Sequence, residues 1–291
     1  EGLVRHELGF WEVANKPTLD ELREYYEKKY YQEARGSYEI SYTEDELRYI
    51  QTKIEQRWNI IAPQFSATGS MLDVGCGEGF AVAAFAEKGW QVRGLDFSRA
   101  GFEAQNPGHA KLLVSGDLFD LLEEERETGN RYDVVWLQNV LEHVLDPVGL
   151  MRSLQQLTLP GGALVVTVPN DFSILQLKAL KAGKIEKPFW VAVPDHMSYF
   201  SNESLRAIGS ATGWDCFEML GDFPVDWFLY NDASNYIAER SVGKKAHRAR
   251  VELENLIGEQ RTEDVAAFFS AIARLGMGRD LTAFFTPSRD D

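Results

Sequence analysis

The sequence predicts an α/β fold built on one open sheet of seven strands, parallel except for an antiparallel last strand. Three observations support this prediction. Residues 70–80 form an apolar run that leads into a glycine-rich turn and then into a helical pattern. Apolar runs of strand length then alternate with amphipathic helical stretches, which is typical of parallel strands covered by helices. A late β-forming run, 281–286, follows two helical segments and supplies the antiparallel strand.

The glycine-rich turn predicts a nucleoside-binding site. Glycine stands at three alternate positions, Gly75, Gly77 and Gly79. Missing Cβ atoms let bare backbone approach a ligand closely. Asp96 ends the next predicted strand, 21 residues after Gly75, which is the spacing at which a carboxylate receives both hydroxyls of a ribose. A dinucleotide fingerprint would need a small residue where Phe80 stands, and Glu78 would repel a pyrophosphate. A nucleoside with an amino group and a positive centre fits better.

Composition narrows the class of partner. The chain has 45 acidic and 30 basic residues and a net charge of −15, which disfavours nucleic acid because phosphate binding needs clustered Lys and Arg. A basic stretch at 244–250 is interpreted as a solvated helix face. The two cysteines, Cys76 and Cys216, indicate no disulfide framework. We recognise no secretion signal and no apolar run of about 20 residues, so we expect a cytoplasmic protein without a membrane span.

Residues 1–66 are expected to form a helical N-terminal cap. Two amphipathic helices are predicted there, at 19–31 and 44–65. The first is rich in tyrosine and includes Tyr30. It is either a flap over one edge of the sheet or a lid over the substrate.

Residues 67–291 are expected to form the sheet domain, with a helical insertion at 224–279. Strands are predicted at 70–74, 90–95, 110–115, 132–137, 163–168, from Trp214 onward, and at 281–286. Helices are predicted at 81–88, 118–127, 146–159, 172–182, 202–212, 245–258 and 262–275. The run Pro160-Gly161-Gly162 is expected to end the helix at 146–159, just before the strand that begins at 163.

Three segments resemble a known family. The run D-V-G-C-G-E-G (73–79), taken with Asp96, resembles the class I S-adenosylmethionine-dependent methyltransferases. The phrase N-V-L-E-H-V-L-D-P (139–147) is similar to their small-molecule branch, which includes the ubiquinone-type O-methyltransferases. The segment P-D-H-M-S-Y-F-S (194–201) resembles a segment of sugar and small-metabolite methyltransferases. The resemblance implies a Rossmann-like sheet.

The resemblance also implies the cofactor, S-adenosylmethionine, with S-adenosylhomocysteine as the product. In similar enzymes an acid in the place of Asp117 receives the adenine 6-amino group, and the next backbone N–H, here that of Leu118, reaches a ring nitrogen. From the residues alone, Asp117 is also a candidate N-cap for the helix at 118–127. The full set of cofactor candidates is Asp73, Gly75, Gly77, Gly79, Asp96, Phe97, Asp117, Leu118 and Gln138.

Two histidines are candidate general bases. Such a cofactor already carries an activated methyl group, so the protein must align a nucleophile and remove its proton. His143 and His196 follow the fourth and fifth strands, and imidazole titrates near neutral pH. We prefer His196 as the base, with His143 shaping the pocket floor or sharing the proton. No metal is expected, because Glu142, His143, Asp171 and His196 lack tight ligand spacing.

The acceptor is expected to be a small polar metabolite, methylated on oxygen or nitrogen. The resemblance at 194–201 favours a sugar or surface-glycan precursor. A ubiquinone-type phenol and a non-catalytic cofactor-binding regulator are the alternatives. A homodimer is compatible with the sequence. Aromatic and short polar residues interleave at 224–240, which suits a hydroxylated ring, although they could equally be core residues and turn caps. The acceptor candidates are Tyr30, Asn170, Tyr199, Trp227, Tyr230 and Asn231.

Overall fold

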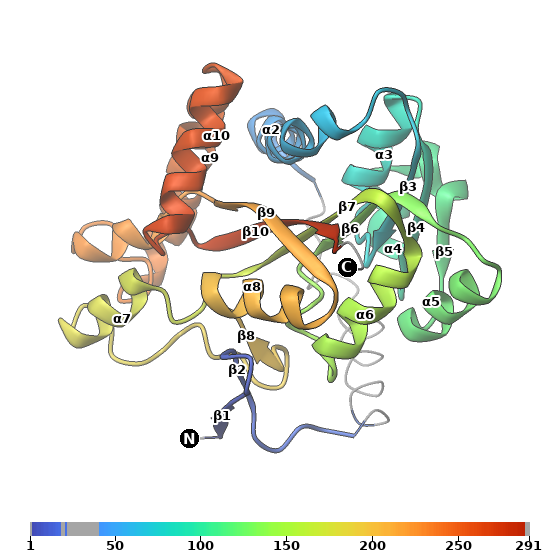
Figure 1. Ribbon diagram of the computed structural model, residues 1–291. Coiled ribbons are helices and arrows are strands. Elements are labelled where there is room, and N and C mark those ends of the chain that lie inside the picture. The colour runs from blue at the N-terminus through green and yellow to red at the C-terminus, as the bar shows by residue number, and fades with distance from the viewer. Residues whose placement is uncertain (1, 19–20, 22–40, 289–291) are drawn as a thin grey trace.

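The computed structural model describes residues 2–18, 21 and 41–288. Its centre is a seven-stranded sheet with the order β5-β4-β3-β6-β7-β10-β9 (Figure 1). The strands are β3 (Ser70–Val74), β4 (Gln91–Asp96), β5 (Leu113–Ser115), β6 (Tyr132–Gln138), β7 (Thr158–Pro169), β9 (Trp214–Gly221) and β10 (Asp280–Pro287). Strand β10 pairs antiparallel with both β7 and β9. The predicted Rossmann-like sheet with an antiparallel last strand is therefore confirmed.

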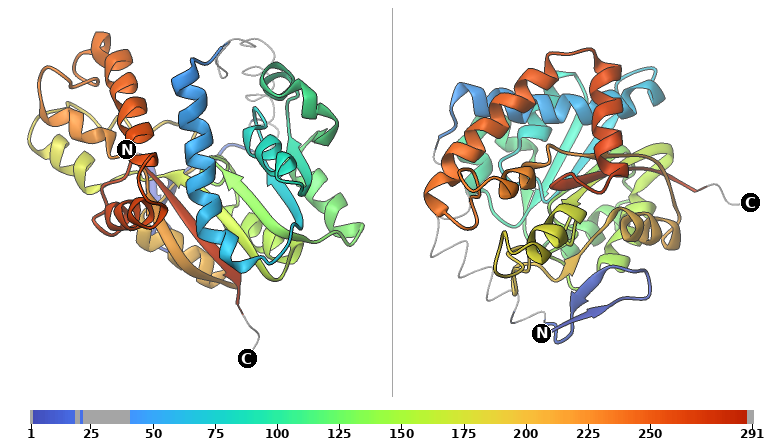
Figure 2. Two further views of the ribbon diagram at one scale, coloured as in Figure 1. Left: turned by 90° about the horizontal axis from the view of Figure 1, so that it is seen from above. Right: turned by 90° about the vertical axis from the view of Figure 1, so that its left-hand side faces the viewer.

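Helices cover both faces of this sheet (Figure 2). Their bounds are α2 (Glu44–Ile61), α3 (Phe80–Glu87), α4 (Ala100–Gln105), α5 (Leu118–Glu127), α6 (Pro147–Leu157), α7 (Ile174–Lys181), α8 (Asn202–Ala211), α9 (Gly243–Gly258) and α10 (Thr262–Arg274). Alternate residues of the central strands enter two separate cores. On β6, Val135 packs with side chains of α5, α6 and α8, whereas Val134 packs with those of α2, α3 and α10. Because both faces are buried, the middle of these strands is mainly apolar, and polar side chains concentrate near the strand ends.

Two strands differ from the prediction by several residues at their first residue: β7 begins earlier than predicted, and β5 begins later. Strand β7 starts at Thr158, because Pro160-Gly161-Gly162 forms an irregularity inside the strand, with Gly161 at φ +81°. The pairing with β6 shifts register between Tyr132 and Val134 as a result. Helix α6 accordingly ends at Leu157. Strand β5 is only three residues long, because residues 107–112 form the 3₁₀ helix η2 (Pro107–Leu112).

The N-terminal region departs from the expected all-helical cap. Strands β1 (Leu3–Arg5) and β2 (Trp11–Val13) pair antiparallel, and β2 pairs with β8 (Ser198–Tyr199) in a second, three-stranded sheet. The physical reason is burial: Phe10 beside β2 is 1% exposed and stacks near Phe200. Helix α2 with the short turn η1 (Ala62–Gln64) confirms the second predicted helix. The helix predicted at 19–31 lies outside the described residues, and the division into cap and sheet domain stays a prediction.

The insertion between β9 and β10 is helical, as predicted. It contains the 3₁₀ helices η3 (Val225–Tyr230) and η4 (Arg240–Val242), followed by α9 and α10. Helix α9 packs against α2, and α10 packs against β9. In the described part of the chain, no helix is both long and apolar enough to cross a bilayer.

Candidate active site

A cleft of about 1770 Å³ lies at the carboxyl ends of β3, β4, β5 and β6, where open α/β sheets bind ligands. Helices α2 and α9 contribute its outer walls. Every predicted cofactor residue lines this cleft: Asp73, Gly75, Gly77, Gly79, Asp96, Phe97, Asp117, Leu118 and Gln138. Both predicted bases, His143 and His196, line it as well. The sheet thus brings these two groups of candidates to one place.

The glycine turn is a cradle that side chains would fill. Gly75, Gly77 and Gly79 all have positive φ, at +73°, +53° and +77°. A Cβ on Gly75 would lie 2.4 Å from Val140, and one on Gly79 would lie 2.3 Å from the Phe102 ring. The backbone N–H of Gly75 donates to Leu95 O at 2.8 Å, which closes the turn onto β4. Only glycine permits this path, so a ligand can approach the bare backbone.

Two carboxyl groups lie at the base of the turn. Asp96 is 9% exposed and accepts the backbone N–H groups of Gly77 at 2.7 Å and Ser98 at 2.9 Å. Burial raises the pKa of Asp96, although these backbone hydrogen bonds oppose the shift. Burial, and then the nearby charge of Asp96, raises the pKa of Asp73 to about 8. Buried acids with raised pKa values are typical of a site that awaits a positive ligand.

Arg57 is a functional candidate that sequence analysis missed. It lies on α2, is 6% exposed, and donates to Gln138 Oε1 at 2.5 Å. Burial lowers its pKa. Within the described ranges, no carboxylate comes within 4.0 Å of its guanidinium, which lies over the Trp136 ring. A buried arginine without an anionic partner is costly, so it fits an anionic ligand group. The sequence did contain one signal for Arg57: its spacing from Ile54 and Ile61 places it on the buried face of α2.

The cofactor candidates follow the order of the strands along the edge of the sheet. Asp117 follows β5, Asp96 ends β4, Gly75 follows β3 and Gln138 ends β6. Asp117 also caps α5, accepting from Phe119 N at 3.0 Å, so both readings of this residue remain compatible. Arg57 lies at the β6 end of this row through its bond to Gln138. A ligand with a base, a ribose and an amino-acid tail could therefore span the row.

The two histidines lie in contact at the β6 and β7 side of the cleft. Their ring centroids are 4.9 Å apart and their planes meet at 85°. His143 Nδ1 lies 2.7 Å from the backbone oxygen of Asp195, so this nitrogen carries a hydrogen, because a carbonyl only accepts. His143 Nε2 lies 3.7 Å from Glu142 Oε1. His196 Nδ1 lies 3.9 Å from Asp171 Oδ2.

Glu142, His143 and His196 could also hold a divalent cation. In the described part of the chain, one ligand atom from each lies within 4.8 Å of the other two. Imidazole nitrogen with a carboxylate oxygen suits several transition metals. Sequence spacing did not reveal this group, because His196 is distant in the sequence from the other two residues. Backbone hydrogen bonds place it beside them: Met197 N and Ser198 N both donate to Glu142 O. Burial raises the pKa of Glu142 well above its usual range. The expectation of no metal stays a prediction.

The predicted acceptor residues do not line the cleft. Asn170 donates to Gly278 O at 2.8 Å, Tyr199 donates to His196 O at 3.1 Å, and Tyr230 donates to Leu175 O at 2.9 Å. Asn231 accepts from Ala233 N, and Trp227 packs on Phe223. Of these residues, Trp227, Tyr230 and Asn231 lie in the insertion and make packing or turn contacts there, which is compatible with the alternative interpretation of 224–240, and the acceptor roles of all five stay predictions. Tyr30 lies outside the described residues.

Residues outside the predicted cofactor and acceptor sets also line the cleft. Helix α2 contributes Tyr49 and Lys53, helix α9 contributes Lys244, His247, Arg248 and Arg250, and the ends of β9 and β10 contribute Asp222 and Asp280. Part of the basic stretch at 244–250 therefore faces the cleft rather than bulk solvent alone. Lys53 is paired with Glu254 at 2.8 Å, and Arg250 is paired with Asp222.

Fold and site together define a class of protein. The strand order, the glycine turn after β3 and the acids after β3, β4 and β5 are the features of a class I S-adenosylmethionine-dependent methyltransferase. A family model described as a methyltransferase domain matches residues 44–218. The chain belongs to this methyltransferase family.

Individual relatives agree with this class. Ubiquinone biosynthesis O-methyltransferases of Citrobacter koseri and Escherichia coli O139:H28 are each 37% identical to this chain over 105 residues. The match covers 34% of this chain and 42% of either relative, so it spans less than half of their length. A solved structure of an S-adenosylmethionine-dependent methyltransferase from Archaeoglobus fulgidus has a TM-score of 0.51 and 17% identity, and covers 91% of this chain and 99% of that one. The latter likeness concerns the fold alone.

Proposed function

We propose that this enzyme methylates an oxygen or nitrogen atom of a small polar metabolite. The observation that carries the proposal is the pair His143 and His196, which lines the same cleft as the glycine turn. Imidazole is the side chain best suited to take a proton from a hydroxyl or ammonium group near neutral pH. The cofactor supplies the methyl group, already activated on a positive sulfonium sulfur.

Five side chains would hold the cofactor, in the order in which the strands present them. Asp117 would receive the adenine amino group, and Asp96 would receive the ribose hydroxyls. Asp73, beside the glycine turn, would accept the ammonium group of the amino-acid tail. Arg57 would neutralise the carboxylate of that tail, with Gln138 keeping the guanidinium in place at 2.5 Å. Asp117 and Asp96 would accept hydrogen bonds from uncharged groups, whereas the ammonium would favour the ionised form of Asp73 and the tail carboxylate would pair with Arg57.

His196 is the preferred general base. The hydrogen on His143 Nδ1 is occupied by the Asp195 carbonyl, and the other nitrogen of that ring is directed toward Glu142. His196 is 17% exposed at its side chain and lines the cleft, so its ring can reach an acceptor. His143 then packs edge-on against His196 and limits its rotation.

The class of acceptor rests on two lines of support. The segment 194–201 resembles sugar and small-metabolite methyltransferases, which favours a hydroxylated acceptor such as a sugar or a glycan precursor. The curated relatives are ubiquinone biosynthesis O-methyltransferases, which keeps a phenol as the second candidate. Both candidates lose a proton from oxygen on methylation, so both need a base in the place of His196.

Calorimetry and a turnover screen test the proposal. S-adenosylhomocysteine should bind the wild-type protein, and Asp96→Ala should weaken this binding because the ribose loses its acceptor. A mass-spectrometric screen of sugars, amines and catechols should then yield a product heavier by one methylene. Binding without turnover of any acceptor would favour a non-catalytic regulator instead.

A further inference from the structure

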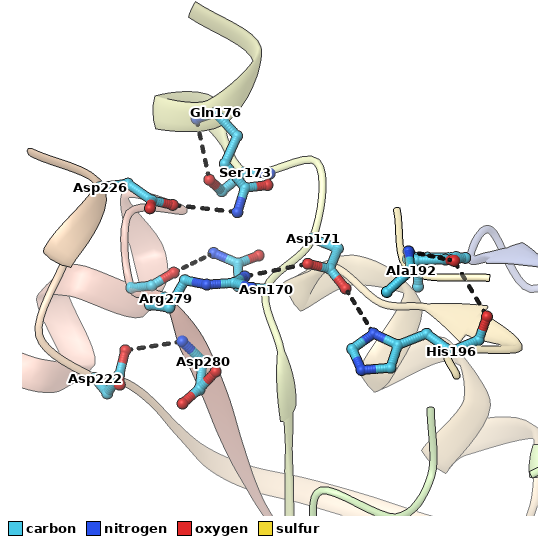
Figure 3. A network of polar contacts seen from close by, with 12 residues as sticks. Asn170, Asp171, Ser173, Gln176, Ala192, His196, Asp222, Asp226, Arg279 and Asp280 are labelled. Carbon is cyan, nitrogen blue, oxygen red and sulfur yellow. Dashed lines mark hydrogen bonds and ion pairs between the residues drawn. The ribbon is translucent and has the colours of Figure 1, made fainter. Parts of the chain in front are cut away.

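Asp171 is a buried carboxylate beside the active site that the proposed reaction has not yet used. It lies two residues after the end of β7, is 2% exposed, and does not line the cleft. Arg279 donates to its Oδ1 at 3.1 Å. Its other oxygen, Oδ2, has no hydrogen-bond donor among the described residues and lies 3.9 Å from His196 Nδ1 (Figure 3). One oxygen is thus neutralised by arginine while the other faces the imidazole.

The environment of Asp171 suits an ion pair with His196. A buried carboxylate oxygen without a donor is energetically costly, so a hydrogen bond from the group that faces it, the His196 ring, would stabilise it. The pKa of Asp171 is raised to about 6 by burial, against the opposing charge of Arg279. The guanidinium of Arg279, 3.1 Å from Oδ1, favours the ionised form of this carboxyl group. Contacts of this kind are often long before substrate binds and tighten in the reactive complex.

The two histidines are held by different groups, and this difference separates their roles. His143 is held by a neutral backbone carbonyl, that of Asp195, at 2.7 Å. The backbone of His196 is fixed by His196 N donating to Ala192 O at 2.7 Å and by Tyr199 donating to His196 O. The ring of His196 faces a carboxylate. A carboxylate stabilises an imidazolium more than a carbonyl does, so His196 is the ring prepared to gain a proton.

We propose that Asp171, oriented by Arg279, is the positioning residue for His196. This inference rests on the proposed function, in which His196 is the base. Asp171 Oδ2 accepts the Nδ1 hydrogen of His196, which leaves Nε2 as the acceptor toward the cleft. His196 Nε2 takes the acceptor's proton as the methyl–sulfur bond breaks and the methyl–acceptor bond forms. The sulfur keeps the electron pair, and Asp171 stabilises the resulting imidazolium.

Asp171→Asn tests this role sharply. The guanidinium of Arg279 can only donate hydrogen bonds, so it pairs with the amide oxygen of the new asparagine and not with its NH₂ group. The amide NH₂ then faces His196 Nδ1 and can only donate to it. That geometry reverses the tautomer, places the hydrogen on Nε2, and removes the base. We expect kcat to fall on the order of 10²-fold or more, with acceptor KM and S-adenosylhomocysteine affinity nearly unchanged. Asp171→Glu, which keeps the charge, should restore part of kcat.

The matched control is Asp195→Asn. Asp195 lies beside the other histidine, with its carboxylate 3.9 Å from His143 Nδ1, and is 31% exposed. Because His143 is held by the backbone carbonyl rather than by this side chain, kcat should change less than about twofold. Long-range ¹H–¹⁵N correlation spectra of the five histidines provide a readout that needs no acceptor. The ring of His196 should show the Nδ1–H form in wild type and the Nε2–H form in Asp171→Asn.

Several results would overturn the proposal. An unchanged His196 tautomer and equal kcat values in the two asparagine variants would show that Asp171 serves packing alone. A larger loss in Asp195→Asn would assign the base to His143. Loss of wild-type activity in EDTA, restored by Mg²⁺ or Mn²⁺, would make His196 a metal ligand. If wild type binds S-adenosylhomocysteine but methylates no acceptor, the proposed function fails before the variants are made.

Discussion

Replacing Asp73 by asparagine should stabilise the protein at alkaline pH, and the size of the effect follows from its burial. Asp73 lies on β3, is 3% exposed, and has a pKa of about 8 in place of its ordinary 3.8. The folded state therefore holds a proton that the unfolded state has already lost above pH 4. Stability contributed by this proton is complete below pH 4 and is lost as pH rises to 8.

The magnitude has an upper bound. A difference of about four pH units, at about 1.36 kcal/mol per unit, corresponds to about 6 kcal/mol. Because relaxation around a buried charge lowers its penalty in real proteins, we expect about 2–3 kcal/mol in practice. Asparagine has nearly the same shape and no proton to lose. Asp73→Asn should therefore unfold at a higher urea concentration than wild type at pH 8.5, and at a similar concentration at pH 4.5.

Urea unfolding followed by circular dichroism at pH 4.5, 6.5 and 8.5 measures this difference. Asp133→Asn is the control: Asp133 lies at the start of the neighbouring β6 and accepts from Ser70 N at 2.8 Å, so losing it should destabilise the protein. A stability gain in Asp73→Asn that is the same at all three pH values would refute the reasoning. The same variant should bind S-adenosylmethionine more weakly, because the ammonium of the tail loses an anionic partner.

Three further predictions concern the cleft. His196→Ala should lower kcat on the order of 10²–10⁴-fold in a methyl-transfer assay, with cofactor affinity by calorimetry unchanged; equal turnover would leave alignment as the whole mechanism. Arg57→Gln should weaken S-adenosylhomocysteine binding about 10–100-fold, because a charged hydrogen bond contributes about 1.5–3 kcal/mol, whereas Arg48→Gln on the exposed side of the same helix should have no effect. Dialysis against EDTA should leave activity intact, and a metal-dependent recovery would assign Glu142, His143 and His196 as ligands.

The sheet and the cofactor turn could be predicted because their signals are local. Each strand carries its own apolar run, and the spacing from Gly75 to Asp96 fits within one strand–helix–strand unit. The position of Asp117 and Leu118 at the end of a strand followed from the same regular alternation, and their expected role followed from the family resemblance. These features need no knowledge of contacts between distant parts of the chain.

The missed features depend on long-range packing. Strand β2 is three residues long, too short for a periodic signal, and its partner β8 lies far along the chain. Arg57 shares the buried face of α2 with Lys53, Ile54 and Ile61, and only its contacts with Gln138 and Trp136 distinguish it from a solvated charge. The acceptor roles proposed at 224–240 stay predictions, because short polar side chains that cap turns have the same composition as those that bind a hydroxylated ring. Asn231, for example, satisfies Ala233 N two residues away.

The pairing of β2 with β8 makes the first residues of the chain part of the active-site support. Trp11 pairs with Tyr199, and Val13 N donates to Met197 O at 3.0 Å, on the segment that carries His196. The family match begins only at residue 44. A chain shortened to that boundary would keep the glycine turn and Arg57 but would leave β8 as an unpaired edge. We expect such a chain to keep its affinity for S-adenosylhomocysteine while the segment that carries the proposed base, His196, loses its support, so cofactor binding alone is a poor criterion for choosing where to cut this protein.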